Sequence, residues 1–139
     1  PRDDAWILGP YIETLENAGL TFHEEWAICC DVQEHVGQSW EAFRTMWQSE
    51  GEKPDALFIT DDTLYQEAAM AILSLGISVP DELLVITHAN TGSDVMYPFP
   101  TARLECDPVR FAATMVEMLR AGIAGETPEP EVLEFVLIG

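Results

Sequence analysis

Positive charge is scarce in this sequence. Its 139 residues include six Lys and Arg against 25 Asp and Glu, which leaves a formal net charge of −19 at pH 7. The acidic residues are spread along the chain, so we interpret the charge as a solvated surface that favours solubility. Such a surface repels the phosphates of a nucleic acid at long range. We therefore expect that these residues do not bind DNA by themselves.

Long apolar runs are also missing. No run approaches the roughly 20 residues that a membrane-spanning helix needs, and the start of the chain lacks the basic region and apolar core of a signal peptide. The three cysteines, Cys29, Cys30 and Cys106, are odd in number, and Cys29-Cys30 falls in an apolar run. We therefore expect buried, reduced thiols. These features predict a cytoplasmic protein without a membrane partner.

The sequence has none of the common catalytic or metal-binding patterns. It contains no Gly-x-Ser-x-Gly elbow, no glycine-rich phosphate loop and no Cys-x-x-Cys. His23 and His35 have no partners at metal-ligand spacing, so we expect no enzyme, no cofactor and no metal. Asp61 and Asp62 could also form the phosphate-accepting pocket of a receiver domain. That class of protein needs an acidic pair after its first strand and a lysine late in the chain. The only lysine is Lys53, so the sequence does not favour a receiver domain.

The clearest local pattern is a strand-helix-strand unit in the middle of the chain. Residues 56–60 are typical of a buried strand, Asp61 or Asp62 can cap the helix that follows, Gly76 ends that helix, and residues 83–87 form the next strand. Parallel strands joined by a helix place their carboxyl ends at one edge of the sheet, where ligands bind in open α/β folds. The two aspartates therefore fall where a binding site is expected.

The rest of the chain alternates between helices and strands in the same way. We predict helices over residues 8–18, 36–49 and 107–124, strands over residues 25–30, 102–104 and 132–138, and a polar loop over residues 88–100. No linker divides the sequence, and its length suits one domain. The order predicts a single α/β domain, a three-layer sandwich with a mostly parallel sheet.

The central unit and its flanks resemble a known family. The segments that carry the resemblance are Pro54-Asp55-Ala56-Leu57-Phe58, the pair Asp61-Asp62, Leu75-Gly76-Ile77-Ser78-Val79-Pro80-Asp81-Glu82, Leu15-Glu16-Asn17-Ala18-Gly19-Leu20 and Asp107-Pro108. They are similar to the effector-binding domain of lactose/galactose-repressor-type transcription regulators, which has a type I periplasmic-binding-protein-like fold. The resemblance covers nearly the whole chain, and the Val-Pro-Asp-Glu block with its preceding helix is its most specific part.

The resemblance implies that residues 1–139 form one lobe, the C-terminal one, of a two-lobed domain. The first lobe and a DNA-binding helix-turn-helix head would be absent from this sequence, and the helix at residues 107–124 would pack on the missing lobe. In such regulators a ligand that bridges the lobes changes the spacing of the DNA-reading heads in the dimer. We therefore expect DNA binding only through the absent N-terminal head.

The resemblance also implies a site for a small, sugar-like effector at the strand ends, lined by Asp61, His88, Asn90 and Trp6. Three positions depart from the family pattern. Asp61 stands where the family has Asn, Thr87-His88-Ala89 replaces Gly-Phe-Asp, and Trp6 or Ile7 falls where an arginine is expected. The alternative interpretations are structural: Asp61 would cap a helix, and His88 would be a hydrogen-bonded residue of the loop.

A homodimer is implied by the same resemblance, through the helix at residues 63–75 and the loop at residues 96–100. The interface residues would be Tyr65, Leu73, Met96, Tyr97 and Phe99. Aromatic and Met side chains are enriched at the cores of interfaces. The alternative is that Tyr97 and Phe99 fold back onto their own loop.

Two other functions remain open from the sequence. The first is a sugar-binding protein that delivers its ligand to a transporter, which would be monomeric and outside the cytoplasm. The second is an interaction domain that binds no ligand, because the expected arginine and aspartate are both missing.

Overall fold

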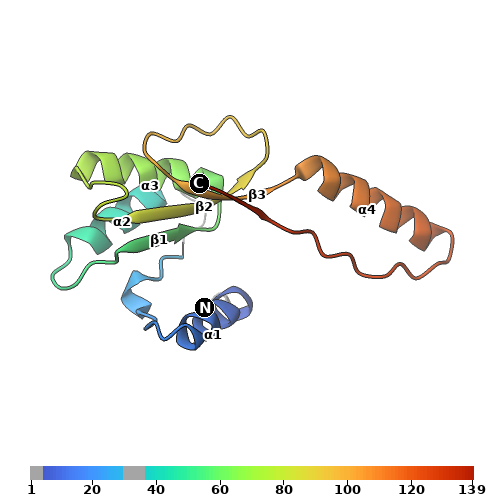
Figure 1. The fold of residues 1–139 in the computed structure, drawn as a ribbon, viewed down its shortest axis with the longest axis horizontal. Helices are drawn as coiled ribbons and strands as arrows, with labels where there is room; N and C mark the ends of the chain where they lie inside the picture. Colours follow the sequence, from blue (N-terminus) through green and yellow to red (C-terminus); the bar gives the residue numbers. More distant parts are fainter. Residues whose placement is uncertain (1–4, 30–36) are drawn as a thin grey trace.

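The chain forms one four-stranded sheet with helices around it in the part that the structure, a computed structural model, describes: residues 5–29 and 37–139, without the side chains of residues 5–7. The elements are α1 (Ala5–Asn17), the 3-10 helix η1 (Glu24–Trp26), α2 (Gln38–Gln48), β1 (Ala56–Ile59), α3 (Asp62–Leu75), β2 (Leu84–Asn90), β3 (Ala102–Cys106), α4 (Pro108–Ile123) and β4 (Val136–Ile138). The strand order is β1-β2-β3-β4 (Figure 1). The first three strands are parallel and β4 is antiparallel to β3, so the predicted α/β fold with a mostly parallel sheet is confirmed.

The β1-α3-β2 unit follows the local signals of the sequence. Asp61 has an extended backbone, and its carboxylate accepts hydrogen bonds from backbone N–H groups in the first turn of α3. Gly76 ends the helix with a φ of 70°, a left-handed conformation that glycine adopts without strain. β2 then pairs in parallel with β1, so that Ile59 lies opposite Thr87.

The core lies between the sheet and the helices α2 and α3. Three alanines in α3 are buried, and their small side chains let the helix approach its neighbours closely. Phe43 of α2 is buried, while Trp40 and Trp47 pack at the edge of the core. The buried apolar core residues are Phe43, Met46, Ile59, Tyr65, Ala68, Ala69, Ala71, Ile72, Leu83 and Val85.

The strand predicted at residues 25–30 is wrong. Glu24–Trp26 form η1 instead, and residues 27–29 are not a strand; residue 30 lies outside the described part of the chain. The backbone N–H of Trp26 donates to the carbonyl of His23 at 3.0 Å, and the His23 ring stacks on the Trp26 ring with centroids 4.0 Å apart. These local contacts decide the conformation of a short apolar run whose pattern does not distinguish strand from helix.

Smaller differences concern element ends and the thiols. β2 continues to Asn90, into the predicted loop, and the last strand is reduced to Val136–Ile138. Cys29 is exposed, so the prediction of a buried thiol is wrong there. Cys106 is half-buried, and Cys30 lies outside the described residues.

Helix α4 extends away from the sheet, and the segment after it returns to pair as β4 (Figure 1). None of its residues is buried. Its exposed large apolar side chains are Val109, Phe111, Met115, Val116, Met118, Leu119 and Ile123. Packing of this helix on another lobe stays a prediction. Within residues 5–29 and 37–139, no helix has the length and apolar character to cross a membrane.

Candidate functional site

The carboxyl ends of β1, β2 and β3 meet at one edge of the sheet. β2 and β3 end together, with Asn90 opposite Cys106, and the N–H of Thr91 donates to the Cys106 carbonyl at 2.9 Å. Two helices begin at this edge, α3 after β1 and α4 after β3. Their first turns present backbone N–H groups and the positive end of the helix dipole. The edge therefore combines hydrogen-bond donors with several polar side chains.

Asp61 and Asp107 are the N-cap residues of these two helices. The Oδ1 atom of Asp61 accepts from Thr63 N at 2.8 Å and from Leu64 N at 3.4 Å. Asp107 caps α4 in the same manner. Asp61 thus has a structural role that needs no ligand, in agreement with the alternative drawn from the sequence.

His88 and Asn90 lie two residues apart on β2 and face the same side of the sheet. They face away from α2 and α3, because the alternate residues Val85, Thr87 and Ala89 are buried against those helices. The half-buried His88 ring meets the Phe135 ring edge-on, with centroids 5.3 Å apart, so this histidine contacts the returning C-terminal segment. Asn90 is exposed at the end of the strand.

Trp6 belongs to α1, but its side chain lies outside the described part of the structure. Of the four predicted ligand residues, the structure therefore places Asp61, His88 and Asn90 at the ends of two neighbouring strands, β1 and β2.

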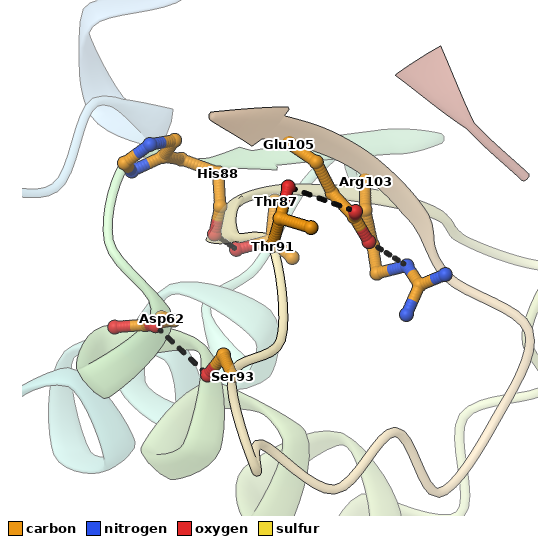
Figure 2. A network of polar contacts seen from close by, with 7 residues as sticks. All are labelled: Asp62, Thr87, His88, Thr91, Ser93, Arg103 and Glu105. Atoms are coloured by element: carbon orange, nitrogen blue, oxygen red, sulfur yellow. Dashed lines mark hydrogen bonds and ion pairs between the residues drawn. The ribbon is translucent and has the colours of Figure 1, made fainter. Parts of the chain in front are cut away.

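Polar groups that the sequence did not single out lie beside these residues. Figure 2 shows Ser93 turned toward Asp62, with Oγ and Oδ2 3.4 Å apart, and Thr91 turned toward Glu105 at 3.5 Å. Glu105 also pairs with the Arg103 guanidinium at 3.4 Å. Of this network, the sequence had indicated only Asp62, which follows Asp61 at the carboxyl end of a predicted strand. No local signal joins Thr91 to a residue 14 positions away.

A cavity of about 210 Å³ opens next to this network, between the end of β3, the first turn of α4 and the returning segment. Its polar lining includes Glu105, Asp107, Glu134 and Arg110. Arg110 also pairs with Glu131 at 3.4 Å, which ties the start of α4 to the returning segment. Carboxylates and a guanidinium can chelate neighbouring hydroxyl groups of a polyhydroxylated molecule. The described residues contain no group of three or more His, Cys, Asp or Glu placed to hold a metal ion.

The residues predicted at a dimer interface divide into two sets. Tyr65 is fully buried: its hydroxyl bonds to Thr101 Oγ1 at 3.0 Å, and its ring contacts those of Tyr97 and Phe99. Tyr97 and Phe99 are half-buried on this cluster, as in the alternative in which they fold back.

Arg103 lies over the Tyr97 ring, 4.9 Å from its centroid. Burial raises the pKa of Tyr97, and the charge of Arg103 opposes that rise. In contrast, Leu73 and Met96 are 54% and 79% exposed, and Met70 on the same helix as Leu73 is 62% exposed. Only this second set is available to a partner.

Comparison with known proteins gives one consistent result. Residues 3–138 match the family described as periplasmic binding protein-like domain. An uncharacterized HTH-type transcriptional regulator, YkvZ of Bacillus subtilis, is 26% identical over 128 residues, covering 92% of this chain and 38% of that protein. The HTH-type transcriptional repressor PurR of Yersinia enterocolitica is 25% identical over 126 residues, covering 89% of this chain and 36% of that protein.

Solved structures agree with these relatives. A putative transcriptional regulator of the LacI family from Sanguibacter keddieii is 26% identical, with a TM-score of 0.71, over 93% of this chain and 48% of that one. The transcriptional regulator CelR in complex with cellobiose is 25% identical, with a TM-score of 0.72, over 95% of this chain and 40% of that one. The chain thus spans a little over a third of the curated relatives and less than half of these structures.

Proposed function

The chain belongs to the periplasmic-binding-protein-like domain family as an effector-binding domain of the LacI type, and we propose that it binds a small, polyhydroxylated effector and forms a homodimer. The observation that supports the effector most is the meeting of polar side chains, helix N-termini and a cavity at the carboxyl edge of the parallel sheet. Ligands of open α/β sheets bind at this edge.

The proposed effector contacts this edge from the side of His88 and Asn90, with Asp61 and Trp6 as further lining. Arg110 and Asp107 in the neighbouring cavity add planar charged groups that bind pairs of hydroxyls. In this proposal these two residues take the place of the arginine and aspartate that the sequence lacks at the usual positions. The bound cellobiose of the related CelR structure supports a sugar-like ligand class.

The proposal places the effector between this lobe and another lobe of the regulator. The exposed apolar side chains of α4 support this arrangement, because a contiguous exposed apolar surface usually marks a site of contact with a partner. An effector that binds the closed arrangement better than the open one shifts the lobe angle, and the dimer converts that shift into a change in DNA affinity. DNA contact occurs through a separate head, because this lobe is strongly acidic.

Dimerisation in this proposal uses the exposed side chains of α3 and of the loop after β2. Met70, Leu73 and Met96 are apolar and exposed, whereas Tyr65 is buried and contacts Tyr97 and Phe99 within the chain's own core. Because a regulator of this kind acts on DNA, we place it in the cytoplasm. We propose no catalytic step for it.

Thermal unfolding in the presence of a ligand panel tests the effector. The protein is melted alone and with pentoses, hexoses, disaccharides and nucleobases at 10 mM each. A ligand that binds the folded state raises the midpoint in a concentration-dependent manner. The proposal predicts such a rise for at least one sugar, whereas no response to any compound would favour a domain that binds no effector. A monomer with tight sugar binding would favour the transporter-linked alternative.

A further inference from the structure

The segment that returns from α4 to β4 carries an exposed aromatic side chain beside the effector edge. Phe135 is 54% exposed and directly precedes β4. Val136 lies opposite Glu105 in the antiparallel pairing, so Phe135 comes level with Cys106, the next residue of β3. Cys106 in turn lies opposite Asn90, the last residue of β2. Phe135 therefore stands in line with the carboxyl ends of the parallel strands.

Phe135 also lies on the side of the sheet from which the effector is proposed to bind. His88 pairs with Leu104, and Leu104 pairs with Leu137, so these three side chains share one face. Phe135 comes two residues before Leu137 and therefore points to the same face. Its ring contact with His88 agrees with this placement. Glu134, the preceding residue, lines the cavity of about 210 Å³, so that cavity lies on the other side of the segment.

The contact with His88 orients the Phe135 ring and leaves part of it open. The two ring planes make an angle of 80°, so one ring presents its edge to the face of the other. In either arrangement the His88 ring covers no more than one face of the Phe135 ring. More than half of Phe135 is exposed, and no further ring contact to it is found within the described residues. A flat apolar surface is therefore available to a ligand.

Polar groups stand on the far side of a gap from this ring. Asn90 and Phe135 are separated by two strand spacings, about 10 Å, with the small side chain of Cys106 between them. The Asn90 amide offers two donors and an acceptor. Beyond it, at the end of β1, Asp61 uses its Oδ1 atom to cap α3, and no hydrogen bond to its Oδ2 is found among the described residues. The gap thus has an apolar wall on one side and hydrogen-bonding groups on the other.

A pyranose has matching properties. Its hydroxyl groups project around the rim of a rigid ring, while C–H groups on a face of the ring form an apolar surface. Such a surface gains free energy by covering an aromatic ring, because both are removed from water. An open-chain polyol carries the same hydroxyls but has no rigid face, and it loses more conformational freedom on binding.

We propose that Phe135 is the stacking platform of the effector site and that the effector is a pyranose. The C–H face of the sugar lies on the Phe135 ring, and its hydroxyls reach Asn90 and Asp61. His88 positions the ring through their edge-to-face contact. This inference rests on the proposed function, for which it names the class of ligand and a residue that determines specificity.

The first test compares rings with matched open chains. The 139-residue chain is titrated by calorimetry with the methyl pyranosides of glucose, galactose and mannose, and with sorbitol, galactitol and mannitol. One pyranoside or more should bind roughly fivefold more tightly than its open-chain counterpart, since only the ring can stack. Saturation-transfer NMR of that pyranoside should show the strongest signals from C–H protons of a single face. Equal affinity of every pyranoside and its polyol would overturn the proposal.

The second test changes the platform. Phe135→Leu keeps an apolar side chain but removes the flat ring, so it should weaken the pyranoside by roughly fivefold, whereas Phe135→Trp should retain its affinity. Phe111→Leu, at a 49% exposed position of α4, is the matched control and should bind as the wild type does. If Phe135 were exposed only to pack on another lobe, Phe135→Leu would behave as this control does, which would overturn the proposal. If Phe135→Leu does not fold by circular dichroism, Phe135→Met serves instead.

The possible failures have different signatures. If no sugar of any kind binds, the proposed function and this inference both fall. If a sugar binds equally to wild type and Phe135→Leu, or if only sugars other than these pyranosides bind, the proposed function stands and the inference falls. A nucleobase that binds more tightly than every pyranoside, with a loss in Phe135→Leu, would overturn the assignment of a pyranose.

Discussion

Glu67 in the middle of α3 caps the first turn of α2 through Ser39. Its Oε2 accepts the backbone N–H of Ser39 at 3.1 Å and also bonds to the Ser39 hydroxyl, and its Oε1 accepts Gly37 N at 2.6 Å. α2 lacks a cap of its own, since Gly37 at its N-cap has no side chain. One carboxylate thus fixes two helices to each other, and these helices cover the core that positions the strand ends.

Glu67→Gln should destabilise the protein by about 1 kcal/mol, the usual cost of losing a helix cap. The effect depends on pH, because the Ser39 hydroxyl and the Gly37 N–H hold the pKa of Glu67 below its ordinary value of 4.5. Its stabilisation is complete above pH 4.5 and is lost as the pH falls through the lowered folded pKa. Urea unfolding at pH 7 and at pH 3 should therefore show a smaller difference between wild type and variant at pH 3. Glu41→Gln, at an exposed position of α2, is the control and should change the free energy of unfolding at pH 7 little.

Asp61→Ala should cost about 1 kcal/mol of unfolding free energy, because the variant loses the acceptor for Thr63 N. Asp61→Asn keeps an acceptor oxygen and should retain most of the stability. Comparison of these two variants distinguishes a helix-capping role of Asp61 from a ligand-binding role. If Asp61→Asn melts normally but loses the midpoint shift produced by a sugar, Asp61 binds the effector; if both properties are retained, its role is structural.

Tyr65→Phe should destabilise by about 1 kcal/mol, because it removes the hydroxyl that bonds to Thr101 within the chain's own core. Burial raises the pKa of Tyr65 above its ordinary value of 10.0. Its contribution is therefore complete below pH 10 and falls as the pH rises through the folded pKa. Unfolding measured at pH 8 and pH 11 should show a steeper loss for wild type than for Tyr65→Phe. An equal loss in both proteins would show that Tyr65 does not titrate in this way.

Leu73→Asp combined with Met96→Asp should convert a dimer into a monomer in analytical ultracentrifugation, with little change in thermal stability, because both side chains are exposed. Tyr97→Asp is a poorer probe, since this ring packs on Tyr65 and carries Arg103. Val132→Asp, also at an exposed position, is the matched control. An unchanged mass for the double variant would remove α3 and the following loop as the interface.

Much of the central fold could be predicted because its signals are local. Asp61 caps α3 and Gly76 ends it, so this helix is found within a residue of its predicted ends. The wrong strand at residues 25–30 had an ambiguous apolar pattern, and contacts between His23 and Trp26 decided its conformation.

The candidate site was predicted less completely, because its members meet only through the tertiary fold. The rule that ligands bind at the carboxyl ends of parallel strands predicts Asp61 and Asp62, and the family resemblance implies His88 and Asn90 as further lining. No local pattern indicates that Arg110 and Glu105 line the same cavity. Nor does any local pattern indicate that Glu67 bonds to Ser39 of α2, 28 residues away. Burial of Tyr65 beneath Tyr97 is of the same kind.

Calorimetric titration of the sugar that most raises the melting midpoint tests the effector edge most directly. Asn90→Ala removes an exposed amide at the end of β2, and Asn17→Ala removes an exposed amide at the end of α1, far along the chain from that edge. The account predicts that Asn90→Ala weakens the sugar at least tenfold while Asn17→Ala binds it as the wild type does. Equal affinities in all three proteins would contradict an effector site at the carboxyl ends of the strands.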